Sequence, residues 1–286
     1  MADTNNLLVS TEWLESHLAD EGLCIIDVSI VIGRPVEGRV TFRPGRDEYA
    51  ESHIPGAVFL DLKQDLSANH PELMFMLPDR DAIAAGLAAC GVNPDTQVVL
   101  YNRGPSWWAT RVWFMLEHIG FDNAAVLDGG FDAWVAEGRP TQEGWVEPSP
   151  GVLTAYQGAE NFVTKQGVID VLNEADVVLL NALSAEQHRG EVNPYGRPGH
   201  IPGSINLPAT SVLDDGGHFK SVAALNELLP KPTTATIHYC GGGISASLTA
   251  FAERLTGRDG VKIYDGSLSE WARDPDTPLS LGDSGS

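Results

Sequence analysis

The chain has 286 residues, 43% of them hydrophobic, which is enough for one large domain or two ordinary domains with separate cores. Its formal net charge of −21 predicts an acidic surface, which repels phosphate backbones and anionic membrane faces. Nucleic acids and membranes are therefore excluded as expected partners.

The N-terminus and the cysteines favour a cytoplasmic protein. Residues 1–10 hold neither a basic run nor an apolar stretch typical of a signal peptide, and no later apolar run approaches the length of a membrane span. The chain has an odd number of cysteines, which are Cys24, Cys90 and Cys240, and none of them forms a Cys-x-x-Cys motif. Neither a disulfide framework nor a zinc site is therefore expected. Cys24 and Cys90 lie in apolar surroundings typical of buried cysteines.

The first half of the chain predicts three buried strands and a helix. The strands are apolar or β-branched runs at residues 23–28, 98–101 and 124–127. Trp108, Val112 and Met115 mark a helical pattern between the second and third runs. Gly120 follows at the place of a helix C-cap.

A Pro-rich stretch without periodicity from Gly138 to Gly151 predicts a linker. We place this linker at residues 141–157, between a first domain of residues 1–140 and a second of residues 158–286. It is expected to run extended over the surface.

The second half predicts the same succession of elements. Its strands lie at residues 177–180, 236–239 and 261–264. The helix is marked by apolar residues at i, i+3, i+4 and i+7, which are Leu248, Phe251, Ala252 and Leu255. Gly257 takes the place of Gly120 as the expected C-cap.

Short motifs also occur twice. The segment His53 to Ala57 is repeated as His200 to Ser204, and Asp128-Gly129-Gly130 before Trp134 is repeated as Asp265-Gly266-Ser267 before Trp271. Strands that alternate with helices form parallel βαβ units. We therefore predict two α/β domains, each an open, mostly parallel sheet flanked by helices on both faces.

Cys240 directly follows the predicted strand at residues 236–239, where ligand sites form in open parallel sheets. Three glycines follow it, and a helix is expected to begin near Ser245. Inward-pointing amides and a helix N-terminus favour an anion, and therefore favour the thiolate over the thiol. The same amides would stabilise a persulfide anion after sulfur transfer. Cys240 is predicted to be the nucleophile.

These motifs resemble the tandem rhodanese family, which includes thiosulfate and 3-mercaptopyruvate sulfurtransferases. The similarity covers nearly the whole chain through the paired His-Ile-Pro-Gly motifs, the Asp-Gly-Gly and Asp-Gly-Ser motifs, and the Cys240 loop. It implies that only the second domain is catalytic, and Asn102 stands at the place matching Cys240 in the first. The resemblance implies substrate binding by Gly241, Gly242, Gly243, Ile244 and Ser245, and catalysis by a cysteine persulfide without a metal or organic cofactor.

Loop length argues against a phosphatase or arsenate reductase. The rhodanese-like phosphatases carry a longer loop with an arginine that clamps phosphate. Residues 240–245 fit the six-residue loop of the sulfurtransferases, and no arginine follows at Cys-x5-Arg spacing. A phosphoryl dianion would lack its bidentate partner.

The uncharged loop favours 3-mercaptopyruvate as the sulfur donor. Thiosulfate enzymes of the family resemble Cys-Arg-Lys-Gly-Val-Thr in this loop, and mercaptopyruvate enzymes resemble Cys-Gly-Ser-Gly-Val-Thr. The Cys-Gly-Gly-Gly-Ile-Ser of this chain lacks fixed cations, so attraction to dianionic thiosulfate is weaker than in the first group. Gly242 replaces the serine of the second group.

A second departure concerns proton transfer. The family histidine before a Leu-Pro pair aligns with Phe75, although Asp61 matches the family acid. A Ser-His-Asp relay is therefore not expected, and the leaving enolate must take its proton from water or from another group. His70 is interpreted as an ordinary loop histidine.

Two arginines are candidates for the donor's carboxylate. Arg189 matches the family arginine that faces the catalytic loop, and a guanidinium gives bidentate recognition of a carboxylate. The alternative is a surface ion pair with a nearby acid. Arg197 is a second candidate, at a spacing to His200 that differs from the family's.

Other side chains of the repeated motifs are assigned to the core or to turns. Trp107 and Trp108 open the helix of the first copy, where core packing is favoured over a role in lining a substrate pocket. His53 and His200 occur in both copies, including the one without a nucleophile, which favours a structural role in the turn.

We therefore predict a sulfurtransferase in which Cys240 takes sulfur from 3-mercaptopyruvate and passes it to cyanide, a small thiol or reduced thioredoxin. Three alternatives remain open from the sequence. In the first, the sulfur donor is thiosulfate. In the second, the protein is a persulfide carrier with low turnover of small donors, and in the third it is a non-catalytic scaffold.

Overall fold

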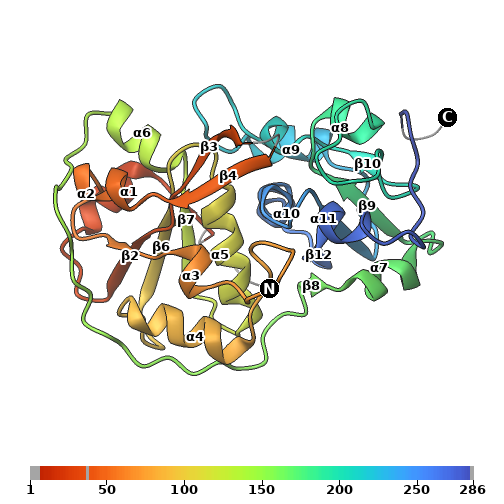
Figure 1. Cartoon of the computed structure of the whole chain (residues 1–286). Helices are drawn as coiled ribbons and strands as arrows, with labels where there is room; N and C mark the ends of the chain where they lie inside the picture. The colour runs from red at the N-terminus through yellow and green to blue at the C-terminus, as the bar shows by residue number, and fades with distance from the viewer. Residues whose placement is uncertain (1–6, 37–38, 284–286) are drawn as a thin grey trace. The chain divides into compact units, whose positions relative to one another are not determined.

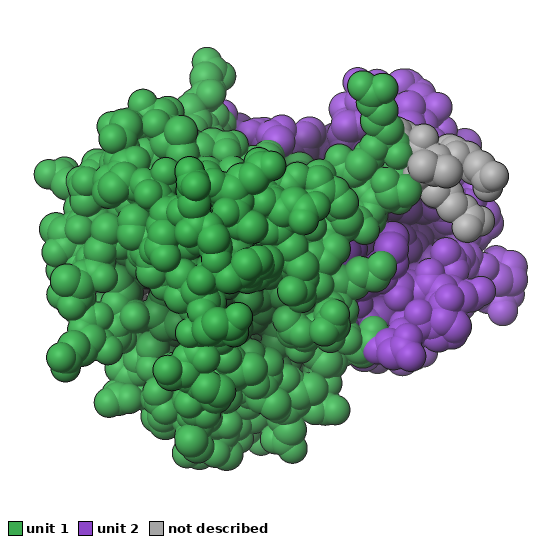
Figure 2. Space-filling model, turned by 60° about the vertical axis from the view of Figure 1, so that its left-hand side comes forward, with its two compact units in different colours: residues 1–68, 77–159, 213–219 green, residues 69–76, 160–212, 220–286 purple. Residues whose placement is uncertain are grey.

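The computed structural model describes residues 7–36 and 39–283, and Figure 1 shows the chain from its red N-terminal end to its blue C-terminal end. Contacts divide it into two compact units, coloured separately in Figure 2. Unit 1 comprises Met1–Ala68, Leu77–Ala159 and Leu213–Phe219, and unit 2 comprises Asn69–Met76, Glu160–Val212 and Lys220–Ser286. Each unit therefore takes in a short segment from the other half of the sequence.

Unit 1 is built on a sheet of five strands in the order β1-β7-β6-β2-β5, and all four neighbouring pairs are parallel. The strands are β1 (Leu8–Val9), β2 (Leu23–Asp27), β5 (Val58–Phe59), β6 (Gln97–Tyr101) and β7 (Ala124–Leu127). The central strands β2, β6 and β7 agree with the three predicted runs. The short edge strands were not predicted, because two residues carry no periodicity.

Helices cover both faces of this sheet. They are α1 (Thr11–His17), α2 (Arg46–Glu51), α3 (Leu62–Asp65), α4 (Arg80–Ala89), α5 (Trp107–His118) and α6 (Gly130–Ala136). Leu14 of α1 and Trp134 of α6 pack with Ile25, Val99 and Leu127 of the strands in one core cluster. Helix α1 connects β1 to β2 in one direction across the sheet, and α5 connects β6 to β7 in the opposite direction. Because such crossovers are right-handed, α5 lies on the face opposite to α1.

In unit 1, β2 is followed by an antiparallel hairpin of β3 (Ile30–Val36) and β4 (Arg39–Pro44). This pair forms a separate two-stranded sheet. The hairpin was not predicted from the sequence, since the segment contains Gly33, Pro35 and Gly38, which disfavour a strand.

Unit 2 repeats the architecture. Its sheet has the order β10-β9-β11-β12-β8, and all neighbours are parallel. The strands are β8 (Phe162–Val163), β9 (Val177–Asn181), β10 (Ile205–Asn206), β11 (Ala235–Tyr239) and β12 (Val261–Tyr264). When this sheet is followed from β8 to β10, its strands correspond one to one to β1-β7-β6-β2-β5 of unit 1. The predicted fold class of two mostly parallel α/β sheets is confirmed.

The helices of unit 2 are α7 (Lys165–Val171), α8 (Ala185–Arg189), η2 (Ala209–Val212), α9 (Val222–Leu228), α10 (Ser245–Leu255) and α11 (Ser267–Trp271). Helices α7, α8 and α9 begin at polar caps. Ser184 forms a capping box with Gln187, and Thr164 and Ser221 each accept a backbone N–H of the first turn. Helix α10 packs on β11 and β12 and contacts α9 and η2, whereas α7 contacts α11.

The paired His-Ile-Pro-Gly turns are tied to the central strands in the same way. The amide of Ile54 donates to the hydroxyl of Tyr101 at 3.3 Å, and the amide of Ile201 donates to the hydroxyl of Tyr239 at 3.1 Å. His53 and His200 are buried. The structural role predicted for these turns is consistent with that arrangement.

Gly120 and Gly257 lie after α5 and α10 with φ of 78° and 77°, as expected for C-cap glycines. In the part of the chain that the structure describes, we find no helix with the length and hydrophobicity of a transmembrane segment.

Candidate active site at the Cys240 loop

Cys240 lies immediately after β11, at the carboxyl end of the central strand of unit 2. Three glycines separate it from Ile244, and helix α10 begins at Ser245 as predicted. Gly243 has a φ of 73°, a conformation that a side chain would strain. Cys240 is buried in the folded loop, with 2% of its surface exposed.

Ser267 forms hydrogen bonds with the Cys240 loop. Its hydroxyl oxygen accepts the amides of Cys240 and Gly243 at 3.1 and 3.0 Å and donates to the carbonyl of Tyr264 at 2.8 Å. These two amides are therefore engaged by Ser267. Within the described ranges, the amides of Gly241, Gly242 and Ile244 have no protein acceptor.

Sequence reasoning missed the role of Ser267, although a signal for it was present. Ser267 stands in the second Asp-Gly-x motif where the first has Gly130, and both residues have positive φ, 49° and 60°. A serine in this conformation costs about 1 kcal/mol or more. The hydrogen bonds to the loop offset that strain.

A buried polar network lies beneath the loop, between β11 and α10. Nε2 of His238 lies 2.8 Å from a carboxylate oxygen of Glu253, and Nδ1 lies 2.9 Å from the hydroxyl of Thr249. Thr236 donates to the other carboxylate oxygen at 3.1 Å. The four side chains are at most 4% exposed. The network ties the strand that ends at Cys240 to the helix that follows it.

Burial alone would raise the pKa of Glu253, but the hydrogen bond and charge of His238, with Thr236 and Arg258, outweigh it and lower the pKa. Glu253 is therefore an anion in the folded protein at neutral pH. A buried anion is tolerated here because each carboxylate oxygen has a hydrogen-bond donor.

The loop after β6 in unit 1 is built differently. Asn102 replaces the cysteine, and its amide nitrogen donates to the carbonyls of Arg103 and Pro105 at 2.7 and 2.9 Å. The side-chain oxygen of Asn102 accepts the amide of Ala109 at 3.0 Å. Carbonyl oxygens, rather than free amides, surround this position, so the loop of unit 1 does not suit an anion.

A family model described as the rhodanese-like domain matches this chain twice, over residues 10–137 and 157–274. The chain belongs to the rhodanese family. The first match covers the sheet of unit 1 apart from β1, and the second covers the sheet of unit 2 together with the Cys240 loop. Rhodanese sulfurtransferases generally work through a catalytic cysteine, and the loop of unit 2 holds Cys240.

Curated rhodanese relatives span the whole chain. A "Probable 3-mercaptopyruvate sulfurtransferase" of Pseudomonas aeruginosa is 33% identical over 291 residues, covering 96% of this chain and 98% of the relative. A "Putative thiosulfate sulfurtransferase SseB" of Mycobacterium tuberculosis is also 33% identical, over 295 residues, with 96% and 97% covered. The crystal structure of SseA from Escherichia coli, titled as a 3-mercaptopyruvate enzyme, superposes with a TM-score of 0.81 at 29% identity, covering 92% of this chain and 98% of SseA. This rhodanese is a sulfurtransferase.

Arg189, predicted to bind the donor's carboxylate, lies at the end of α8. Its Nε and Nη2 reach the two carboxylate oxygens of Glu191 at 2.7 and 3.0 Å, and Asp283 lies 3.9 Å from Nη1. The guanidinium is thus paired in a bidentate fashion with an exposed acid. A donor carboxylate would have to replace Glu191 as its partner.

Arg197, the second predicted arginine, is used structurally. All three of its guanidinium nitrogens donate to backbone carbonyls of the segment 271–277, among them those of Ala272 at 3.1 Å and Thr277 at 2.9 Å. We therefore correct the substrate-binding prediction for Arg197. Its side chain instead holds its own segment to residues 271–277. The sequence could not show this, because the acceptors lie 74 to 80 residues further along the chain.

The histidine of the second His-Ile-Pro-Gly turn stacks on a second histidine. The rings of His188 and His200 are 3.7 Å apart and 10° from parallel. Burial, followed by the charge of His200, lowers the pKa of His188 to about 4. In unit 1 Tyr49 takes the equivalent place, stacked on His53 at 4.0 Å.

Three further residues singled out in the sequence have local roles. Asp61 caps α3 by accepting the amides of Lys63 and Gln64 at 3.1 and 3.2 Å. Phe75 is buried, with a φ of 61°. His70 is exposed, and its Nδ1 accepts the amide of Leu73 at 2.9 Å, as an ordinary loop histidine would.

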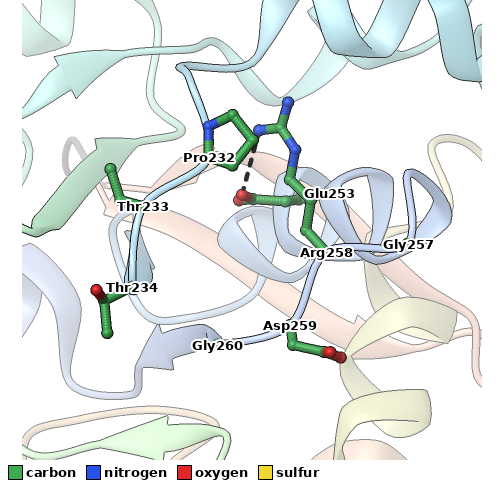
Figure 3. Close-up of a pocket in the computed structure, with 8 residues that line it drawn as sticks. All are labelled: Pro232, Thr233, Thr234, Glu253, Gly257, Arg258, Asp259 and Gly260. Atoms are coloured by element: carbon green, nitrogen blue, oxygen red, sulfur yellow. Dashed lines mark hydrogen bonds and ion pairs between the residues drawn. The ribbon is translucent and has the colours of Figure 1, made fainter. Parts of the chain in front are cut away.

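A pocket of about 380 Å³ lies at the amino ends of β11 and β12 (Figure 3). Cys240 follows the carboxyl end of β11. The pocket is lined by residues 232–234 before β11 and by Gly257 to Gly260 before β12. The guanidinium of Arg258 and the carboxylate of Glu253 point toward each other there, 3.5 Å apart. Because ligand sites of open parallel sheets form at the carboxyl ends of the strands, we do not assign sulfur transfer to this pocket.

No group of three or more His, Cys, Asp or Glu side chains suited to a metal ion occurs among the described residues.

Proposed function

We propose that this rhodanese transfers sulfur from 3-mercaptopyruvate, through a persulfide on Cys240, to a thiol or cyanide acceptor. The observation that carries the proposal is the uncharged Cys240 loop, whose free amides at Gly241, Gly242 and Ile244 can hold a sulfur anion. A loop without a fixed cation suits a monoanionic keto acid better than dianionic thiosulfate. The names of the Pseudomonas and E. coli relatives support the same donor.

The reaction proceeds in two halves. The Cys240 thiolate attacks the donor sulfur, an S–S bond forms, and the S–C bond breaks with its electron pair passing to the enolate of pyruvate. After protonation pyruvate leaves, and the persulfide anion remains on the loop amides. An acceptor thiolate, from a small thiol or reduced thioredoxin, then takes the outer sulfur and returns Cys240 to its thiolate.

Arg189 is proposed to bind the donor's carboxylate by exchanging Glu191 for it. The pair is partly exposed, since the Arg189 side chain is 30% and that of Glu191 56% accessible. Exposed ion pairs are worth about 1 kcal/mol or less, so the exchange costs little. Replacement of Arg189 by Lys should raise KM for mercaptopyruvate more than it lowers kcat.

Thiosulfate is the second candidate donor, and the name of the Mycobacterium relative favours it. The two candidates differ in the ratio of kcat/KM for mercaptopyruvate and thiosulfate. A ratio above one supports our proposal, and a ratio below one supports the alternative.

The test is steady-state turnover of both donors by the wild-type protein and by Cys240→Ser, with intact mass recorded after donor addition. Wild type should gain one sulfur atom and release pyruvate, and Cys240→Ser should do neither. Burial raises the pKa of Cys24 to about 11 and that of Cys90 to about 12, so both remain thiols at neutral pH and serve as internal controls. Persulfide formation without turnover would indicate a carrier protein instead, and absence of persulfide with either donor would indicate a scaffold.

A further inference from the structure

Tyr195 lies against the Cys240 loop within unit 2. A Cβ atom built on Gly241 would fall 2.3 Å from the hydroxyl oxygen of Tyr195 and 2.5 Å from its Cζ. The phenol therefore rests on the Cα of the residue next to Cys240. Gly241 has no positive φ, so a glycine is needed here for space and not for backbone conformation.

The segment that carries Tyr195 is held in place by three kinds of contact. The side chain of Asn193 accepts the amide of Tyr195 at 3.1 Å, which forms a tight turn. Two residues later, Arg197 clamps the segment to the carbonyls of residues 271–277. The side chain of Gln187, at the start of α8, is a hydrogen-bonding neighbour of the phenol. The role of Arg197 is thus to position Tyr195.

The hydroxyl of Tyr195 stays protonated beside the sulfur. Burial raises its pKa, and the charge of Cys240 raises it further, which also places the two groups within electrostatic reach. At neutral pH the phenol therefore keeps a proton that it can donate to an anion on the Cys240 loop.

Several other polar side chains of unit 2 near the loop are engaged elsewhere or uncharged. His238 is bonded through both ring nitrogens to Thr249 and Glu253. Ser267 donates its proton to the carbonyl of Tyr264. The hydroxyl of Tyr239 lies 2.7 Å from that of Ser204. His188 is neutral at pH 7, since burial and His200 lower its pKa to about 4.

We propose that Tyr195 is the catalytic acid that protonates the enolate leaving from 3-mercaptopyruvate. The proposal rests on the proposed function and supplies the proton for which the sequence offered no donor. As the S–C bond breaks, the phenol gives its proton to the enolate carbon and pyruvate forms. The new persulfide, Cys240–S–SH, returns its proton to the phenolate and remains as the anion. No external acid, oxidant or reductant is required.

The test compares Tyr195→Phe, which keeps the ring on Gly241, with Tyr156→Phe, a control on an exposed tyrosine of unit 1. In single-turnover measurements, persulfide loading from mercaptopyruvate should slow about 100-fold in Tyr195→Phe, within the usual range for loss of a general acid. Loading from thiosulfate should be unchanged, because sulfite leaves without needing a proton. Transfer from the loaded persulfide to a thiol should also be unchanged. The control variant should match wild type throughout.

Two outcomes would overturn the assignment. Loading from mercaptopyruvate at the wild-type rate would show that the proton comes from elsewhere. An equal slowing of both donors and of unloading would show that Tyr195 only supports the loop. If wild type itself releases no pyruvate, the proposed function fails together with this one, whereas pyruvate release by wild type with an unaffected Tyr195→Phe removes the Tyr195 proposal alone.

Discussion

The loops that follow β6 and β11 occupy the same place in two sheets of the same strand order, yet their polarity is opposite. In unit 1 the amide group of Asn102 donates to carbonyl oxygens of its own loop. In unit 2 the amides of Gly241, Gly242 and Ile244 have no protein acceptor, within the part of the chain that the structure describes. The shared fold supplies the position, and the hydrogen-bonding groups of the loop decide what that position can bind.

The difference continues beneath the loops. Unit 2 places Thr236, His238 and Glu253 in a hydrogen-bonded network. With Tyr101 matched to Tyr239 and the start of α5 matched to that of α10, the equivalent residues of unit 1 are Val98, Leu100 and Met115. These three are fully buried and apolar. Unit 2 therefore has three hydrogen-bonded polar side chains at buried positions where unit 1 has apolar ones.

The third difference is at the Asp-Gly-x corner. A Cβ on Gly130 would fall 2.5 Å from the carbonyl oxygen of Asn102, so unit 1 requires glycine there. Unit 2 has room for Ser267, whose hydroxyl holds two amides of the Cys240 loop.

The strongest test of the comparison moves the nucleophile. We expect the double variant Cys240→Ser/Asn102→Cys to stay at least about a thousandfold below wild type in sulfur transfer, because the loop of unit 1 presents carbonyls to the new thiol. Intact mass and peptide mapping after incubation with donor are the measurements. A persulfide on residue 102 would contradict our interpretation of loop polarity.

The second test removes the network. His238→Leu leaves Glu253 as a buried carboxylate without its main partner and should lower the free energy of unfolding by about 3–5 kcal/mol. The triple variant Thr236→Val/His238→Leu/Glu253→Met copies unit 1 and should recover most of this loss. Urea unfolding at neutral pH measures both.

The pH dependence of the same variants has a defined sign. The folded-state pKa of Glu253 is lowered, so its stabilisation is present above the ordinary carboxyl pKa and is lost as the pH falls through the folded value. The triple variant lacks this acid-dependent contribution. Equal acid sensitivity of wild type and triple variant would argue against an ionised Glu253.

The third test exchanges the stacked pair. The pKa of His188 falls from 6.5 to about 4 on folding, so the unfolded chain binds more protons between these values and the fold loses stability as the pH drops through that window. His188→Tyr, which copies Tyr49 of unit 1, should remove about 2 kcal/mol of this loss at pH 5. Thermal unfolding at pH 7 and pH 5 measures it, and an unchanged difference between the two would refute the assignment.

The smallest expected effect comes from Ser267→Gly, which copies Gly130. Relief of the positive φ partly offsets the two lost hydrogen bonds, so we expect a net loss of about 1 kcal/mol in stability. Sulfur transfer should fall about tenfold, because the loop amides are no longer held. Activity at the wild-type level in a stable variant would show that the loop holds its shape without Ser267.

Much of the candidate site was predictable because it is local in sequence. A buried strand, Cys240, three glycines and a helix start follow one another directly, and helical periodicity placed α10 correctly. Ser267 and Tyr195 escaped prediction because each reaches the loop from a segment far along the chain. For the same reason Arg197 was predicted to bind substrate, although its acceptors lie in the segment 271–277.

The sequence by itself determined the family, the fold class, the central strands and the position of the proposed nucleophile, since hydrophobic periodicity and contiguous motifs encode them. Tertiary structure alone decided that Asn69–Met76 packs with unit 2, that Ser267 takes two loop amides and that Tyr195 covers Gly241. These contacts join residues distant in the chain, and their energies depend on burial and hydrogen-bond geometry, which only the folded arrangement defines.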